Sequence, residues 1–99
     1  MDISDTEDLL SLREHFRLSE HALREAHKEG LRAEDVLYAV LHGDIIEQYP
    51  ERQRVLIVGP VRQSETPVHV VCDYGSAELV AVTVYIPNRP HWLTAVNRG

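Results

Sequence analysis

The chain has 99 residues, of which 43% are hydrophobic and 26% are charged, and its formal net charge is −6. This length supports one hydrophobic core and excludes two, and the spread of aliphatic residues excludes a disordered chain. No apolar run reaches the roughly 20 residues that a membrane-spanning helix needs. We therefore expect one soluble domain without a membrane partner.

The single cysteine and the acidic first ten residues bear on where the protein works. One cysteine cannot form an internal disulfide, and an acidic N-terminus lacks the basic start of a secretory signal. We expect a cytoplasmic protein. The net negative charge also opposes the general attraction to phosphates, so an RNA or DNA partner requires a local basic patch.

Three helices are predicted in the first half of the chain. Residues 4–15 begin with a capping-box pattern, and residues 1–15 are expected to form a helical appendage. Residues 20–29 follow a serine N-cap and end at a glycine. Residues 33–42 begin with two acids, which the helix dipole favours, and end at a second glycine. The last two helices form an αα-hairpin.

The second half of the chain has the two-residue period of β-strands. Residues 44–49 and 53–59 are predicted to form one hairpin, and residues 67–87 a second hairpin that turns around Gly75 and Ser76. The predicted fold is α+β, with N-terminal helices, including the αα-hairpin, packed on one face of a four-stranded antiparallel meander sheet.

This fold predicts a single domain over residues 1–99. Its α+β core is expected over residues 16–87. Residues 88–99 have no clear period and are predicted to form an irregular C-terminal tail. The patterns leave the oligomeric state open.

The alternation assigns a face to each residue of the last two strands. The face expected to pack on the helices is mostly aliphatic and consists of Val68, Val70, Cys72, Tyr74, Val80, Val82, Val84 and Ile86. The opposite, mixed face consists of His69, Val71, Asp73, Leu79, Ala81, Thr83 and Tyr85. We expect any functional site on the mixed face, because the aliphatic face is needed for the core.

Six histidines and one cysteine raise the question of a metal site or a nucleophile. His15, His21 and His27 recur every six residues, which places them on different faces of a helix, and no histidine has a recognised zinc spacing. We therefore expect no metal and no cofactor. Cys72 alternates with valines and is expected to be a packed, inert thiol.

The mixed face offers a set of side chains for acid–base chemistry. His69, Thr83 and Tyr85 lie on neighbouring strands, where an imidazole can move a proton and the hydroxyls can donate hydrogen bonds. Arg52 and Arg54 of the first hairpin can hold a phosphate. Such a set suits metal-free cleavage of a phosphodiester through an activated ribose hydroxyl. The alternative is an ordinary solvated sheet face, on which tyrosine and threonine serve strand formation.

Several short motifs follow one another in a distinctive order. They are LSEHALREAHKEGL with Ser19, His21 and Ala22, then Gly30, GDIIEQYP with Gly43 and Glu47, PVHVV over Val68 to Val71, and TVYIP near the end. The run that they mark, from Leu18 to Tyr85, covers about two-thirds of the chain. This run resembles the small bacterial family called domain of unknown function 4258.

That family is similar to the metal-free ribonuclease toxins of the RelE and barnase-like superfamily. In those proteins helices cover one face of an antiparallel sheet, and the other face holds RNA. The resemblance implies that His21 and His69 are catalytic, with Tyr85 as a further candidate. It also implies RNA as the substrate and an antitoxin as a protein partner.

The leading hypothesis is therefore a toxin-like RNA endonuclease. His69 or His21 acts as general base or acid, and Tyr85 and Thr83 position the substrate. The phosphate contacts are assigned to Arg24, Arg52 and Arg54. The alternative is a non-catalytic module on the same scaffold that binds a protein partner, with His21 an ordinary surface residue beside Glu25. The net charge favours the module, and the histidine pattern favours the enzyme.

Overall fold

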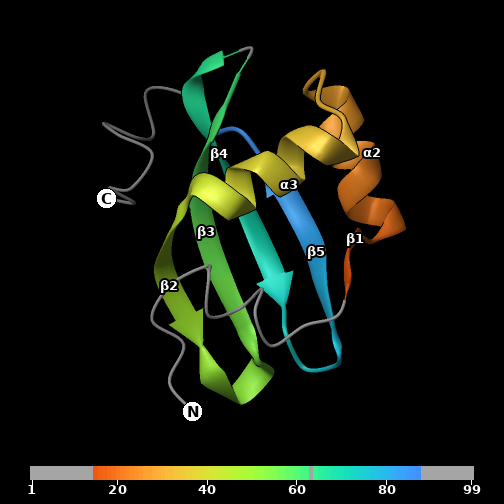
Figure 1. Cartoon of the computed structure of the whole chain (residues 1–99), viewed down its shortest axis with the longest axis vertical. Helices are drawn as coiled ribbons and strands as arrows, with labels where there is room; N and C mark the ends of the chain where they lie inside the picture. The colour runs from red at the N-terminus through yellow and green to blue at the C-terminus, as the bar shows by residue number, and fades with distance from the viewer. Residues whose placement is uncertain (1–14, 63, 88–99) are drawn as a thin grey trace.

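The structure, a computed structural model, describes residues 15–62 and 64–87 (Figure 1). Its elements are, in chain order, β1 (His15–Leu18), α2 (Glu20–Lys28), α3 (Ala33–His42), β2 (Asp44–Tyr49), the 3₁₀ turn η1 (Pro50–Arg52), β3 (Arg54–Val61), β4 (Ser64–Asp73) and β5 (Glu78–Tyr85). The five strands form one mixed sheet in the order β1-β5-β4-β3-β2. The predicted α+β class is confirmed, and α2 and α3 agree with the predicted helices to within one residue.

The predicted four-stranded antiparallel sheet was wrong by one strand. β2 to β5 form an antiparallel meander, but β1 lies beside β5 and runs parallel to it, with His15 opposite Glu78. His15 was expected to end the first helix, residues 4–15, the rest of which lies outside the described residues. β1 is only four residues long, and its Phe16 and Leu18 pack against the core. So short a run carries too little alternation to be distinguished from the flank of a helix.

The expected appendage and tail cannot be compared with the structure. Of the predicted appendage, residues 1–15, only His15 is among the described residues, and the predicted tail, residues 88–99, lies outside them. Both assignments stay predictions. Within the described part of the chain, neither α2 nor α3 is long and apolar enough to cross a membrane.

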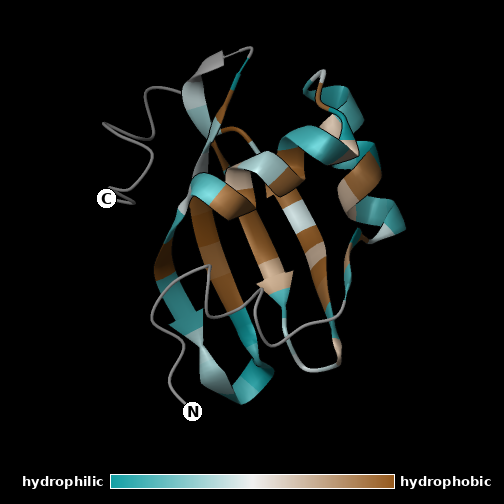
Figure 2. Cartoon of the chain, viewed as in Figure 1, coloured by the Kyte–Doolittle hydropathy of each residue, from teal (hydrophilic) through white to brown (hydrophobic). Residues whose placement is uncertain are grey.

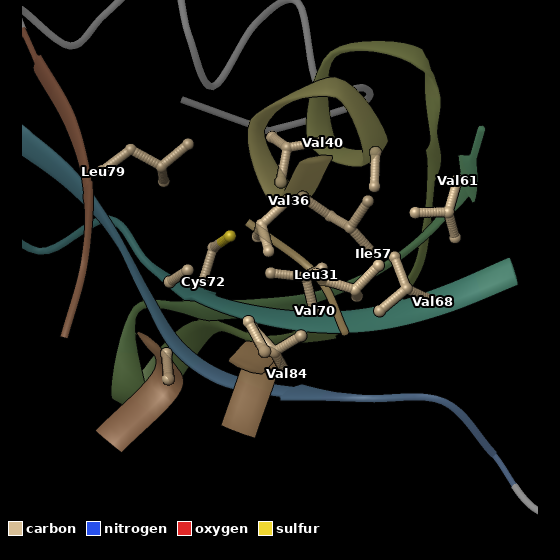
Figure 3. Close-up of a cluster of buried hydrophobic side chains, with 14 of the residues drawn as sticks. Leu31, Val36, Val40, Ile57, Val61, Val68, Val70, Cys72, Leu79 and Val84 are labelled. Atoms are coloured by element: carbon tan, nitrogen blue, oxygen red, sulfur yellow. The ribbon is translucent and has the colours of Figure 1, made fainter. Parts of the chain in front are cut away.

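Both helices lie on one face of the sheet and bury its aliphatic side chains. In Figure 1, α3 crosses over β3 and β4, and α2 lies beside β5. The strands beneath α3 are strongly hydrophobic (Figure 2). Figure 3 shows the centre of the core, where Val36 and Val40 of α3 lie with Ile57, Val70 and Cys72 of the sheet. No helix of the described ranges, residues 15–62 and 64–87, lies on the opposite face of the sheet.

The closest approach of α3 to the sheet occurs at a glycine. Gly59 of β3 is buried, and a Cβ atom built on it would overlap the carbonyl oxygen of Ala39 and lie 2.8 Å from the Ala39 Cα. Gly43, which follows α3, is similarly tight against the same carbonyl. Only a residue without a side chain lets helix and strand backbones touch there.

The start of α2 is fixed on β5. The Ser19 hydroxyl accepts a hydrogen bond from the Ala22 N–H at 3.1 Å, which confirms the predicted N-cap. The Ser19 N–H donates to the Ala81 carbonyl of β5 at 2.9 Å. The helix ends at Lys28, and Gly30 in the turn that follows has a φ of 76°, which suits a glycine. The first turn of α2 is therefore held at the edge of β5.

The predicted faces are correct for β4 and only partly correct for β5. In β4, the three residues buried beneath the helices are Val68, Val70 and Cys72. Between β4 and β5, Cys72 pairs with Ala81, but its neighbour Val71 pairs with Thr83. Val82 is therefore an extra, bulged residue of β5. The buried residues of β5 are Leu79, Ala81 and Val84. The bulge reverses the alternation before it, so the prediction was wrong for Leu79, Val80, Ala81 and Val82.

Candidate functional site

The face of the sheet turned away from α2 and α3, which we call the outer sheet face, carries the candidate site. Successive side chains of a strand alternate, so the neighbours of the core residues point to this face. They form three rows across β3, β4 and β5, which are Val58, His69 and Tyr85; Leu56, Val71 and Thr83; and Arg54, Asp73 and Val80. The edge strand β2 extends the rows with Asp44, Glu47 and Tyr49.

His69 and Tyr85 occupy opposed positions on β4 and β5, and their side chains are in contact. His69 Nδ1 lies 3.1 Å from the Tyr85 hydroxyl oxygen, and the two ring centroids are 5.0 Å apart. The tautomer of the histidine decides which of these two atoms donates the hydrogen. The pair therefore offers a direct path for a proton between an imidazole and a phenol.

The two members of the pair differ in their access to solvent. His69 is fully buried, whereas Tyr85 is partly exposed. Burial raises the pKa of Tyr85, because the phenolate would lose solvation. The phenol is therefore neutral at physiological pH and can donate its hydrogen. A molecule on the outer sheet face would meet the Tyr85 hydroxyl first, so any acid–base role of His69 runs through Tyr85.

Thr83 belongs to the neighbouring row of the same face. It lies two residues before Tyr85 on β5, opposite Val71, and is partly exposed. The sheet therefore brings His69, Tyr85 and Thr83 together. Among these three, the two residues of β5 are partly exposed and His69 is buried.

Arg54 and Arg52 lie toward the other end of the sheet. Arg54 pairs with Asp73, four residues beyond His69 on β4, which places it roughly 13 Å from the histidine along the strand. Its Nε lies 3.4 Å from the Asp73 carboxylate, so part of its charge is already compensated. Arg52 is exposed on η1, at the tip of the β2–β3 hairpin. Neither arginine lies next to the His69–Tyr85 pair.

His21 reaches the sheet through Glu25. His21 Nε2 lies 3.3 Å from Glu25 Oε1, and the same oxygen accepts a hydrogen bond from the Val84 N–H at 3.0 Å. Val84 directly precedes Tyr85 in β5. The imidazole of His21 thus lies within two hydrogen-bond lengths of the β5 backbone, although the histidine itself belongs to the helical layer.

Arg24 and Lys28 continue the polar side of α2 beyond His21. They follow at three and seven residues, positions that neighbour one another on a helix surface. Both are exposed. Arg24 is therefore the predicted phosphate contact that lies on the same element as His21.

Cys72 and the acids of the described residues suggest neither a nucleophile nor a metal site. Burial, with a smaller effect of the Asp73 charge, raises the pKa of Cys72 to about 12, so its thiol is protonated at neutral pH. Among residues 15–62 and 64–87, no group of three His, Cys, Asp or Glu side chains is placed to hold a metal ion.

Two grooves lie on the helical side of the molecule. One, of about 580 Å³, runs along α3, where the Arg62 guanidinium carbon lies 4.6 Å from the centre of the Tyr38 ring. The other, of about 340 Å³, is mostly apolar and is lined by residues such as Phe16 and Leu23. Neither groove includes His69 or Tyr85, so neither belongs to the outer sheet face.

Glu25 is the residue of this region that the sequence did not single out. The spacing of His21 and Glu25 on one helix signals their pairing. The contact of Glu25 with Val84 joins residues 59 positions apart, and no local pattern signals it.

Comparisons with known proteins give one match. The model of the family described as Domain of unknown function (DUF4258) matches residues 18–86. No curated protein and no solved structure matches the chain.

Proposed function

Because the chain belongs to the DUF4258 family, whose description assigns no activity, we propose from the chemistry of its site that it is a metal-independent RNA endonuclease. Its assignment to a bacterial toxin–antitoxin system rests on the resemblance to RelE and barnase-like ribonucleases. An antitoxin is accordingly the expected protein partner, and the cytoplasm the expected place of action.

The observation that carries this proposal is the His69–Tyr85 contact on the outer sheet face. RNA can be cut without a metal when its own 2′-hydroxyl attacks the adjacent phosphorus. One group must take the proton of that hydroxyl, and another must give a proton to the leaving 5′-oxygen. A neutral phenol held by an imidazole at 3.1 Å suits the second task, since it carries the proton that O5′ needs, and the phenolate left behind takes a proton from solvent.

The remaining tasks are assigned to the other candidate side chains. His21 takes the proton of the 2′-hydroxyl, the bond from O2′ to phosphorus forms, and the bond from phosphorus to O5′ breaks as Tyr85 protonates O5′. The products are a 2′,3′-cyclic phosphate and a 5′-hydroxyl. Thr83 donates a hydrogen bond to the substrate, and Arg24 binds a phosphate next to the cleaved one. Arg52 and Arg54, at the far end of the sheet, bind more distant phosphates of a longer strand.

The Tyr85→Phe variant tests the proposal most cleanly, because it removes one hydroxyl and keeps the ring. We expect wild-type protein to cleave single-stranded RNA in the presence of a chelator and Tyr85→Phe to be slower by ~100-fold or more. The melting temperature should fall by only a few degrees, because one hydrogen bond is lost. Tyr38→Phe is the matched control, because Tyr38 lies on the helical side, and it should cleave like wild type.

Two results would contradict the proposal. One is a wild-type protein that leaves RNA intact and yields no cyclic phosphate ends. The other is a Tyr85→Phe variant that cleaves as fast as the Tyr38→Phe control, which would place the chemistry elsewhere.

A non-catalytic module that binds a protein partner is the second candidate function. Two observations favour it, namely the net charge of −6, which opposes RNA binding, and the full burial of His69. Under this alternative, His69 and Tyr85 form a structural hydrogen bond. The variant Tyr85→Phe would then lower stability by about 1 kcal/mol and leave partner binding unchanged.

A further inference from the structure

Glu25 makes two contacts through one oxygen atom. Its Oε1 accepts the Val84 N–H of β5 at 3.0 Å and lies 3.3 Å from Nε2 of His21. The first contact crosses from the helical layer to the sheet, and the second stays on α2. One carboxylate therefore connects the imidazole of His21 to the strand that carries Tyr85.

The two side chains differ in how firmly they are held. The His21 side chain is 63% exposed and that of Glu25 is 26% exposed. An exposed pair at this helix spacing is normally weak, because both side chains must give up rotamer freedom to meet. Glu25 is already held by the Val84 N–H, so only His21 has to be ordered. The contact with β5 thus turns an ordinary surface pair into an anchored one.

We propose that Glu25 is a positioning residue that holds His21 at the edge of β5, at the backbone of Val84, the residue before Tyr85. This proposal rests on the proposed function, in which His21 takes the proton of the ribose hydroxyl. It joins two groups that the fold supplies from different layers, the imidazole of α2 and the Tyr85–His69 pair of the sheet.

The contact also selects the tautomer of His21. The nitrogen that faces a carboxylate carries the hydrogen, and the other nitrogen keeps its lone pair. With Nε2 toward Glu25, the free lone pair lies on Nδ1. Glu25 therefore presents His21 as a base, which is the state that removal of a proton from a hydroxyl requires.

The anchoring is measured by nuclear magnetic resonance, independently of any activity. At about pH 8 we expect the ring nitrogens of His21 in the wild type to show the Nε2–H form. In Glu25→Ala both tautomers should be populated, and the Val84 amide should exchange with solvent at least tenfold faster. Glu29→Ala, at the exposed end of the same helix, is the matched control and should change neither signal.

The catalytic consequence is measured on the same proteins. Glu25→Ala and His21→Ala should reduce the rate of RNA cleavage by similar factors, and the double variant should be no slower than His21→Ala alone. Glu25→Gln is the control for the case that Glu25→Ala loosens α2. It keeps an oxygen that accepts the Val84 N–H, so the Val84 amide should stay protected from exchange. It removes only the negative charge, so its rate should lie between those of wild type and Glu25→Ala.

The results separate the two proposals. A tautomer and a Val84 exchange rate that stay unchanged in Glu25→Ala overturn the anchoring, whatever the activity. Cleavage that falls in His21→Ala but not in Glu25→Ala overturns the positioning role and keeps the proposed function. A wild-type protein that shows the Nε2–H tautomer but cuts no RNA overturns the proposed function, and the role of Glu25 in catalysis falls with it.

Discussion

Burial raises the pKa of one residue on each face of the sheet. On the outer sheet face it raises the pKa of Tyr85, and on the core face it raises the pKa of Cys72 to about 12. In each case the charged form would lose its water, so the neutral form is favoured. For Tyr85 this yields a proton donor that is accessible from the surface. For Cys72 it yields a thiol without nucleophilic character.

The Cys72 thiol should make the protein less stable at alkaline pH. Its pKa is raised above 9.0 in the folded chain, so the unfolded chain releases the proton first and gains from ionisation. Stability is therefore complete below about pH 9 and is lost as the pH rises toward about 12, by up to ~4 kcal/mol. Tyr85 contributes in the same direction at higher pH.

Urea unfolding followed by circular dichroism at about pH 8 and pH 10.5 measures this loss. Cys72→Ala removes the ionising group at the cost of a small cavity, so it should be less stable than wild type at the lower pH but should lose less on going to the higher one. If both proteins lost the same free energy of unfolding between the two pH values, ionisation of Cys72 would not be the cause of the loss.

At the scale of the elements, the bulge in β5 decides which residues the core contains. Without it, Val80 and Val82 would face the helices and Leu79 would face outward. With Val82 as an extra residue, Leu79 and Ala81 enter the core, while Thr83 and Tyr85 stay on the outer sheet face. The bulge therefore lets one strand supply both the core and the site.

Leu79→Ala and Val80→Ala test this assignment on adjacent residues. Leu79 is fully buried, so its truncation should cost about 2–5 kcal/mol of unfolding free energy. Val80 is only partly buried on the outer sheet face, and its truncation should cost roughly 1 kcal/mol or less. Chemical denaturation measures both, and a larger cost for Val80→Ala would mean that the bulge is misplaced.

Gly59→Ala tests the contact between α3 and β3. The added Cβ would overlap the carbonyl oxygen of Ala39, which is backbone and cannot turn aside, so α3 must move. Overpacking of this kind costs about 1–3 kcal/mol or more. Gly75→Ala is the control, because its Cβ would meet the flexible end of Gln53 at 2.9 Å. Similar melting temperatures for the two variants would argue against close packing at Gly59.

Local patterns predicted α2 and α3 from their helical period and end signals, and the β2–β5 meander from its two-residue period. The same patterns could not predict β1, which has four residues, or the bulge, because Val82 fits an unbroken alternation as well as its neighbours do. The shared face of His69, Thr83 and Tyr85 followed from alternation after the bulge. The contact of Glu25 with Val84 and the distance of Arg54 from His69 depend on register between distant segments, which the sequence alone does not specify.

At the scale of the whole molecule, the proposed function requires an acidic protein to hold a polyanion. The chain has 10 basic and 16 acidic side chains, so its overall electrostatic field repels RNA. The affinity for RNA must therefore come from a few local contacts. The cations proposed for this task lie apart, since Arg24 is on α2 near His21 and Arg52 is at the tip of the β2–β3 hairpin. The length of the RNA should therefore decide which of them matters.

Arg24→Gln and Arg52→Gln should differ in their dependence on RNA length. In the proposed site, a dinucleotide at Tyr85 contacts Arg24 but not Arg52, because even Arg54, which is nearer, lies roughly 13 Å along the strands from His69. Arg24→Gln should therefore weaken the binding of both short and long RNA. Arg52→Gln should weaken only an oligonucleotide long enough to cross the sheet. Each lost phosphate contact should reduce the slope of log affinity against log salt by about 0.7.

Fluorescence anisotropy at several salt concentrations measures these slopes, with a labelled dinucleotide and a labelled ten-nucleotide strand as probes. Lys28→Gln is a useful third variant, because Lys28 lies one turn beyond Arg24 on α2 and extends the same polar side of the helix. If the strand runs from α2 across the outer sheet face, Arg24→Gln and Arg52→Gln together should remove about twice the slope that either removes alone on the longer RNA. Equal weakening of the dinucleotide by both variants would show that RNA does not follow this path, because one short ligand cannot contact both ends of the sheet.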